Sequence, residues 1–482
     1  MQYTQIQRIL GILLMLFSTS MLPAAGVGLY YGEQAREAFL IGFVITMVLG
    51  FLIWLPARGQ RNELRTRDGY LITVMFWLVL GLFGAIPLYL LEMPDLSVAD
   101  AVFESFSGLT TTGATVITGL DTLPRALLFY RQQLQWFGGM GIIVLAVAIL
   151  PLLGVGGMQL YRAEMPGPLK ENKLTPRIAE TAKVLWYIYA SLTLACALAY
   201  WAAGMELFDA IGHSFSTVAI GGFSTHDASI GYYDSPLIEL ICIIFMIICG
   251  INFALHFLAW RHRSLTNYLR DPECRAYLLI LAAVFVVCAA VLIHYQYHDA
   301  WTSIRYSAFQ AVSIATTTGF GVTDFSAWPT LLPFMLLYAS FIGASAGSTG
   351  GGMKVIRVVL LYKQGSREIK RLLHPNGVFP VKLGSRPVPD RVVEAVWGFC
   401  AVYVFTFAVL FLILLGTGLD FVTAFSALAA CINNLGPGLG EVGTHYGELQ
   451  DGVKWVLSFA MLLGRLEVFT LLVLLTPMFW RR

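Results

Sequence analysis

Four variants of one short motif punctuate the chain: TTTGAT at Thr110–Thr115, AIGGFS at Ala219–Ser224, TTTGFG at Thr316–Gly321 and NNLGPG at Asn433–Gly438. The central glycines recur about every 110 residues, and such a fixed period indicates an internal repeat. They are Gly113, Gly222, Gly319 and Gly436. A short, mildly apolar run precedes each motif and a long apolar run follows it. The sequence therefore predicts four copies of one structural unit.

The glycine at the centre of each motif indicates a backbone conformation or a close contact that a side chain would prevent. Glycine adopts positive φ freely and leaves room for a closely approaching backbone. Four such loops around one axis would present a ring of carbonyl oxygens, which is how a protein replaces the water shell of a dehydrated cation. We therefore predict a cation pore lined by the four motifs.

The composition is that of an integral membrane protein. Hydrophobic residues make up 57% of the chain and charged residues 12%, and the mean hydropathy is +0.71. At about 20 residues per span the sequence accommodates about ten transmembrane helices. Its long apolar runs do not alternate as the strands of a membrane barrel would, so the predicted fold class is all-α. Basic residues are spread over the loops, which gives no support for nucleic-acid binding.

The repeating unit is a long apolar helix, a short helix, the glycine loop and a second long helix. The short helices are predicted at residues 99–109, 208–218, 301–315 and 421–432. These segments are too short to cross a bilayer, so each must be re-entrant and must bury its loop in protein or against a water-filled cavity. Each would point its partially negative C-terminal end inward, which favours a cation. In every repeat except the third, the second long helix is expected to be unbroken, as in Pro236–Trp260 of the second repeat and Gly452–Trp480 of the fourth.

The predicted organisation has five parts. An N-terminal pair of transmembrane helices covers 1–69, and the pore repeats cover 70–160, 161–274, 275–371 and 372–482. The first apolar run also has features of a secretory signal, with Arg8 before it and small residues near its end. A second apolar run follows after a short loop, which favours a retained hairpin.

The charges of the loops predict the orientation. Lys and Arg gather in alternate loops, which places both termini in the cytoplasm by the positive-inside rule. Acidic residues gather on the opposite side, where they would concentrate cations at the pore mouth. They are Glu92, Asp95, Asp100, Glu104, Asp209, Asp227 and Asp324. None of the seven cysteines forms a CxxC pair, so buried free thiols are expected rather than disulfides or a zinc site.

Long stretches around these motifs resemble the Trk/Ktr/HKT superfamily of potassium transporters. They include ESFSGLTTTGAT, DAIGHSFSTVAIGGFSTHDASIGY, AGSTGGGMKVIR, NNLGPGLG and GRLEVFTLLVLLTP. The resemblance implies a potassium-uptake pore in the bacterial inner membrane, formed by a homodimer with one pore per subunit. It also implies a cytosolic TrkA-like nucleotide-binding ring as partner, carrying NAD or ATP/ADP, with no cofactor in this chain. The basic segments Arg162–Lys183 and Lys363–Arg391 are its expected docking surface.

The resemblance also assigns the residues of a selectivity filter for K⁺, which would also pass Rb⁺. They are Thr111, Thr112, Gly113, Ile220, Gly221, Gly222, Thr317, Thr318, Gly319, Asn434, Leu435 and Gly436. The fourth loop departs from the other three, with two asparagines and a leucine before its glycine and Pro437 after it. We therefore expect departures from four-fold symmetry there.

A second glycine-rich stretch, GASAGSTGGGMK at Gly343–Lys354, interrupts the second long helix of the third repeat. Glycine costs roughly 1 kcal/mol per position inside a helix, so the stretch breaks it. As a P-loop it has the wrong spacing. It does match the G-x-S-x-G nucleophile motif, which leaves an intramembrane serine hydrolase as a remote alternative. The resemblance favours a gating loop made of Gly343, Ser345, Gly347, Ser348, Thr349, Gly350, Gly351 and Gly352.

Arg465 is expected in the middle of the last apolar span, with Glu467 two residues away. A charge at a helix centre costs at least about 2.5–3.5 kcal/mol, so it must face protein or water. Residues i and i+2 do not share a helix face, so the partners of Arg465 lie elsewhere. Backbone carbonyls of the broken helix are the predicted partners, and the resemblance makes Arg465 the residue that holds the gating loop across the pore. Lys354 is expected to extend to the cytoplasmic interface.

The main alternative is a potassium symporter coupled to protons or sodium. Such transporters use buried carboxylates at mid-membrane and inverted repeats. Here the repeats run in parallel order, and Glu467 is the clearest mid-span acid. A channel-like potassium-uptake protein is therefore the favoured interpretation, and an enzyme is not expected.

Overall fold

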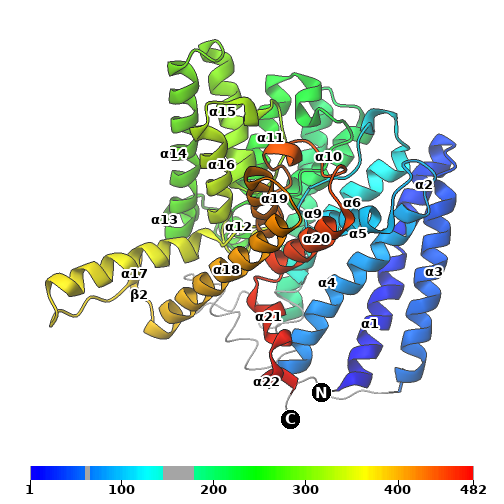
Figure 1. Ribbon diagram of the computed structural model, residues 1–482, viewed down its shortest axis with the longest axis horizontal. Coiled ribbons are helices and arrows are strands. Elements are labelled where there is room, and N and C mark those ends of the chain that lie inside the picture. The colour runs from blue at the N-terminus through cyan, green and yellow to red at the C-terminus, as the bar shows by residue number, and fades with distance from the viewer. Residues whose placement is uncertain (1, 60–65, 145–177, 481–482) are drawn as a thin grey trace.

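The computed structural model describes residues 2–59, 66–144 and 178–480, and this part of the chain is almost entirely helical (Figure 1). Its strands are the two short ones of a hairpin, β1 (Lys382–Leu383) and β2 (Arg386–Pro387). Within these described residues, six helices are able to cross a membrane by length and composition, or eight if each of two bent helix pairs counts as one span. The all-α fold class is confirmed, and the apolar helices at Leu331–Ile342 and Phe421–Asn433 are too short to count as spans.

The N-terminal part is a helical hairpin that stands beside the first repeat (Figure 1, dark blue). It consists of α1 (Tyr3–Ser18), α2 (Met21–Tyr31) and α3 (Arg36–Trp54), followed by the 3-10 turn η1 (Leu55–Ala57). A Cβ added to Gly11 of α1 would lie 2.7 Å from the Trp54 backbone nitrogen, so glycine lets the two helices touch. The hairpin is thus packed as part of the membrane bundle.

The four repeats follow in the predicted order. The first contains α4 (Thr66–Tyr89), α5 (Val98–Leu109), η2 (Leu120–Thr122) and α6 (Arg125–Val144). The second contains α9 (Ile178–Ala202), α10 (Leu207–Ala219), η5 (Ser229–Tyr233), α11 (Pro236–Cys249), α12 (Phe253–His262) and α13 (Thr266–Arg270). The third contains α14 (Pro272–His294), α15 (Ala300–Ala315), η6 (Phe325–Ala327), α16 (Leu331–Ile342) and α17 (Val355–Leu373). The fourth contains α18 (Asp390–Gly416), α19 (Phe421–Asn433), η7 (Gly440–Val442), α20 (Asp451–Arg465), α21 (Phe469–Leu475) and α22 (Pro477–Trp480).

The short helices α5, α10, α15 and α19 lie within about one residue of their predicted bounds. Local capping explains why they start where they do. Ser97 and Asp100 form a capping box on α5, and the side chains of Asp299 and Asp420 cap α15 and α19. One small residue of each short helix is fully or almost fully buried, which allows close packing around the centre of the molecule. These residues are Ala101, Ala210, Ser307 and Ala424.

The expectation of continuous second helices in the second and fourth repeats was wrong. Helices α11 and α12 meet at 93° and helices α20 and α21 at 114°. In the fourth repeat the break follows Arg465, because Glu467 and Val468 both have positive φ. In the second repeat, Asn252 caps the new helix by accepting a hydrogen bond from the Ala254 amide, 2.9 Å away. Arg465 therefore lies at a helix end and not in mid-span.

The third repeat is interrupted over a longer segment, as predicted. Helix α16 ends at Ile342 and α17 begins at Val355, and the intervening residues form the intramembrane loop. Helix α17 then projects from the bundle, and the β1–β2 hairpin lies beside it (Figure 1, yellow). The division between repeats at residues 160 and 161 lies outside the described part of the chain.

Candidate functional site

The four glycine loops share one backbone conformation. The central glycines have φ values of 80°, 81°, 83° and 88° at Gly113, Gly222, Gly319 and Gly436. Two residues earlier each loop again has positive φ, at Thr111, Ile220, Thr317 and Asn434. A side chain is strained in this region, which explains the glycines and marks the four non-glycine positions as held by their surroundings.

One hydrogen bond recurs in all four loops and fixes the turn after each short helix. The amide before the central glycine donates to a carbonyl one helical turn back. The pairs are Thr112 to Ser107, Gly221 to Ser216, Thr318 to Ser313 and Leu435 to Ala430, with distances of 2.8, 2.8, 2.8 and 2.9 Å. The fourth loop therefore keeps this turn despite its different side chains.

The loops touch one another in a closed ring. A Cβ added to Gly113 would lie 2.1 Å from the Gly221 carbonyl oxygen, and one added to Gly222 would lie 2.1 Å from that of Thr318. The next two contacts close the ring. A Cβ on Gly319 would lie 3.1 Å from the Leu435 carbonyl oxygen, and one on Gly436 would lie 2.8 Å from that of Thr112. Each glycine thus makes room for a carbonyl of the following loop, and the first loop follows the fourth.

Polar side chains of α6 fasten the second loop to the first repeat. The Gln135 amide nitrogen donates to the Gly221 carbonyl at 2.6 Å, and its oxygen accepts from the Phe223 amide at 3.1 Å. Gln132 donates to the Phe223 carbonyl at 3.2 Å. A carbonyl oxygen has two lone pairs, so Gly221 can accept this bond and still face an ion.

A buried ion pair lies behind the first loop. Arg131 is 1% exposed and Glu104 fully buried, with Nε and Oε1 2.7 Å apart. The same carboxylate accepts from the Val116 amide at 2.9 Å, and Arg131 stacks over the Phe223 ring. The pair therefore joins the first two loops. Sequence reasoning missed it, although the polar run RQQLQ within an apolar span was a usable signal.

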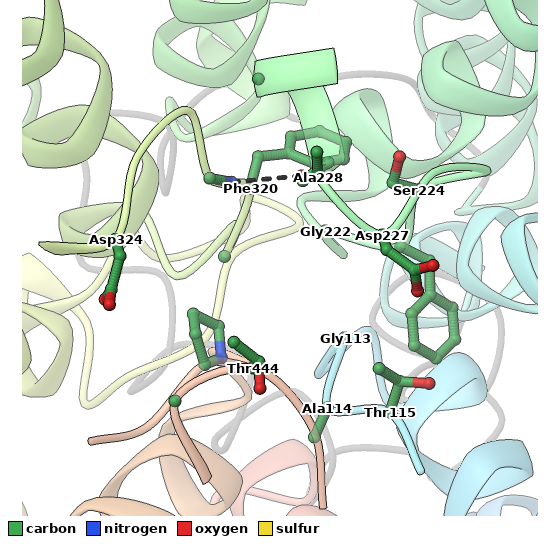
Figure 2. A pocket seen from close by; sticks show the side chains of 18 of the residues that line it. Gly113, Ala114, Thr115, Gly222, Ser224, Asp227, Ala228, Phe320, Asp324 and Thr444 are labelled. Atoms are coloured by element: carbon green, nitrogen blue, oxygen red, sulfur yellow. Dashed lines mark hydrogen bonds between the residues drawn. The ribbon is translucent and has the colours of Figure 1, made fainter. Parts of the chain in front are cut away.

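An outer vestibule opens above the ring. It is a cavity of about 390 Å³, ample for a hydrated ion because one water needs only about 10–15 Å³. Figure 2 shows Gly113, Gly222, Phe320 and Thr444 around it, so all four repeats contribute. Asp227 and Asp324 are the predicted outer acids that line it. Both accept hydrogen bonds from outer loops, Asp227 from the Gly119 amide and Asp324 from Ser326.

Three other predicted outer acids are engaged in ion pairs or in buried hydrogen bonds. Glu104 pairs with Arg131, and Asp100 pairs with Lys454 at 2.6 Å. Asp209 is buried and accepts hydrogen bonds from Thr225 at 2.8 Å, His226 at 3.1 Å and Tyr233 at 2.9 Å. These carboxylates therefore stabilise the outer loops and are not free to attract cations individually.

The intramembrane loop lies directly beneath the ring. Its Gly351 amide donates to the Thr317 hydroxyl at 2.7 Å, and its Gly352 amide donates to the Asn433 carbonyl at 3.1 Å. The Thr349 hydroxyl donates to the Val218 carbonyl at 2.9 Å. The loop therefore contacts the C-terminal ends of α10, α15 and α19, where partially negative helix ends point toward the pore.

Arg465 connects this loop to the opposite side of the bundle. It is 6% exposed and donates to the Thr349 carbonyl at 3.3 Å and to the Gly138 carbonyl of α6 at 2.9 Å. The predicted carbonyl partners are therefore present, one of them in the loop. Glu467 pairs with Arg357 of α17. Lys354 does not extend to the interface as expected, because its buried ammonium donates to the Gly350 carbonyl.

Ser345 has no catalytic surroundings. Its side chain is fully buried, and within the described residues its hydroxyl has no hydrogen-bond partner. Those residues also contain no group of three or more His, Cys, Asp or Glu side chains arranged to hold a metal ion.

Comparison with known proteins identifies close relatives of the whole chain. The profile of the TrkH family, described as cation transport protein, matches residues 35–482. The chain is 59% identical to the Trk system potassium uptake protein TrkH of Halomonas elongata and 57% identical to that of Escherichia coli K12, over 100% of each protein. The crystal structure of the potassium transporter TrkH from Vibrio parahaemolyticus superimposes with a TM-score of 0.93 at 55% identity and full coverage of both chains.

Proposed function

Because the chain belongs to the TrkH family of cation transport proteins, we propose that the ring of four glycine loops is the selectivity filter of its potassium-uptake pore. The protein is a membrane transporter for potassium and not an enzyme. The observation that carries the filter assignment is the closed series of glycine-to-carbonyl contacts around one axis. Carbonyls of Thr112, Gly221, Thr318 and Leu435 lie on this ring, where they would replace the water oxygens of a dehydrated ion.

The filter would work by replacing water oxygens with carbonyl oxygens held at a fixed spacing. Contacts from Gln135, Arg131 and Tyr446 limit how far the loops can move, the last by donating to the Gly436 carbonyl at 2.7 Å. A smaller ion such as Na⁺ then gains less from the ring than it loses in hydration. Rb⁺, similar in size to K⁺, is expected to pass.

The intramembrane loop is the proposed gate, in the conformation that obstructs the pore. It covers the inner side of the ring and contacts three of the four short helices. Its four glycines from Gly347 to Gly352 leave few side chains to pack, so a withdrawn conformation is accessible. Opening would require breaking the contacts with Arg465 and with the helix ends.

Passive conduction fits the site better than coupling to H⁺ or Na⁺. The acids closest to the loop are already engaged, Glu467 with Arg357 and Glu273 with the Ala346 amide. The deciding experiment measures reversal potentials in bilayers containing the purified protein, with K⁺, Na⁺ and pH gradients varied one at a time. We expect the potential to follow the K⁺ gradient alone. A shift with pH or Na⁺ at constant K⁺ would establish the symporter instead.

Relatives named as components of the Trk system imply further subunits. We propose a homodimer in the bacterial inner membrane, with both termini cytoplasmic and one pore in each subunit. A TrkA-like cytosolic ring that binds NAD or ATP/ADP would move the gate. The proposed division of the chain remains 1–69 for the hairpin and 70–160, 161–274, 275–371 and 372–482 for the repeats.

The docking surface proposed for this ring includes the basic end of α17. Lys370 and Arg371 are exposed there, whereas Arg367 is buried and pairs with Asp390 of α18 at 2.6 Å. Charge reversal at Lys370 and Arg371 should reduce co-purification of a TrkA-like ring several-fold and leave membrane insertion unchanged. Arg367→Glu is unsuitable because it would break the α17–α18 contact. Undiminished co-purification would exclude this end of α17, and the other proposed segment, Arg162–Lys183, lies largely outside the described residues.

A further inference from the structure

Glu273 is a buried carboxylate with no part in the filter. It is the second residue of α14, and 6% of its surface is exposed. A carboxylate is rarely buried without strong hydrogen bonds or a positive charge beside it, because desolvation is costly. The identity of its partners therefore indicates what the residue does.

Those partners belong to the two ends of the intramembrane loop. The Ala346 amide, in the first arm of the loop, donates to Oε1 of Glu273 at 2.7 Å. The backbone amide of Ile356 is a second hydrogen-bonding partner of the same carboxylate, and the Lys354 ammonium attracts it. Ile356 lies in the first turn of α17, where amides have no partner within the helix.

The backbone contacts of the loop place Glu273 at its base. The two arms join where the Val355 amide donates to the Ala344 carbonyl at 3.1 Å. The first arm is also attached to the break between α11 and α12. There the Ser345 amide donates to Gly250 at 3.0 Å, and Gly347 accepts from the Phe253 amide at 3.0 Å. The carboxylate thus bridges both arms on the side away from the filter.

We propose that Glu273 is a positioning residue for the gate, which holds both ends of the intramembrane loop in the conformation that closes the pore. This inference rests on the proposed gating function of the loop. Withdrawal of the loop would break the hydrogen bond between the Ala346 amide and Glu273, and a buried acceptor that loses its donor is costly, so Glu273 opposes withdrawal of the loop. Arg465 restrains the middle of the loop from the fourth repeat, and Glu273 restrains its ends from the third.

Substitution by glutamine and by alanine compares partial with complete loss of the acceptor oxygens. Glu273→Gln keeps one oxygen acceptor but turns an NH₂ group toward the remaining donors. Glu273→Ala removes every acceptor. We expect Rb⁺ flux without the cytosolic partner to rise several-fold in Glu273→Gln and roughly ten-fold in Glu273→Ala. The apparent KM for Rb⁺ and the discrimination against Na⁺ should stay unchanged, because the filter is not altered.

Glu394 offers a matched control for the loss of a carboxylate. It is exposed near the start of α18. Glu394→Gln and Glu394→Ala should conduct like the unmodified protein. A second measurement follows the loop itself, through reaction of Ser345→Cys with a water-soluble thiol reagent applied from the cytoplasmic side in a background lacking Cys400. Labelling should be faster when Glu273 is alanine.

The outcomes distinguish this inference from the function it rests on. Glu273→Ala that inserts normally, conducts like the unmodified protein and labels no faster would overturn the inference and leave the filter intact. Increased flux with weakened discrimination against Na⁺ would also overturn it, because the residue would then support the pore as a whole. The proposed function itself fails if the unmodified protein shows no K⁺-selective flux, whatever the Glu273 variants do.

Discussion

Gly113→Ser is expected to reduce discrimination between Rb⁺ and Na⁺ by about ten-fold or more and to lower Rb⁺ uptake as well. The new Cβ would lie 2.1 Å from the Gly221 carbonyl oxygen, a separation that no side chain tolerates. The residue would also have to keep a φ of 80°. The neighbouring loop must then move, and the spacing of the ring carbonyls changes with it.

Gly319→Ser should produce the same kind of defect in milder form. Its Cβ would approach Pro437 Cδ at 2.8 Å and the Leu435 carbonyl at 3.1 Å. Gly321→Ser is the matched control, because Gly321 lies in the same loop with nothing within 4 Å of an added Cβ and no positive φ. The measurement is Rb⁺ uptake with Na⁺ as competitor, in cells that lack other potassium systems. Unchanged discrimination in both Gly113→Ser and Gly319→Ser would show that the ring is not the filter.

The parts of this fold that sequence predicts are those with a local cause. The bounds of the short helices follow from capping residues such as Ser97 and Asp420 and from the glycine motif that follows each helix. The positive φ at Gly113 likewise follows from the motif itself. The interruption after Ile342 follows from glycine content. Such signals lie within a few residues of the feature they determine, so they can be interpreted without knowing what packs nearby.

The parts that sequence does not predict depend on partners distant in the chain. The break after Arg465 contains no glycine or proline, and its positive φ values at Glu467 and Val468 are held by tertiary contacts, including the pair with Arg357. Lys354 stays buried because the loop folds back to offer it a carbonyl. The role of the polar side chains of α6 can be recognised only when the second glycine loop, to which Gln135 donates, is known to pack against them.

Arg465→Ala tests the gate and should increase flux without the cytosolic partner. Arg465 donates to the Thr349 carbonyl in the loop and to the Gly138 carbonyl of α6, so it links the proposed gate to the first repeat. A hydrogen bond to a charged group contributes about 1.5–3 kcal/mol, which corresponds to a roughly ten- to hundred-fold shift in the ratio of closed to open states. Arg465→Lys keeps the charge but cannot reach both carbonyls. Its flux without the cytosolic partner should therefore lie between that of the unmodified protein and that of Arg465→Ala.

Deletion of residues 347–351 should increase ion flux more than Arg465→Ala does. Both variants should reduce the dependence of flux on the cytosolic partner to the same extent. The deletion removes the Thr349 carbonyl together with the contacts to Val218 and Thr317. Adding Arg465→Ala to the deletion should therefore change little, because the two variants remove one shared contact. Single-channel recording in bilayers gives the open fraction directly, and membrane expression controls for misfolding. Arg465→Ala could instead insert normally but open less often. The hydrogen bond between Arg465 and the Gly138 carbonyl would then support the open pore, and Arg465 would not be the residue that holds the loop in the closed conformation.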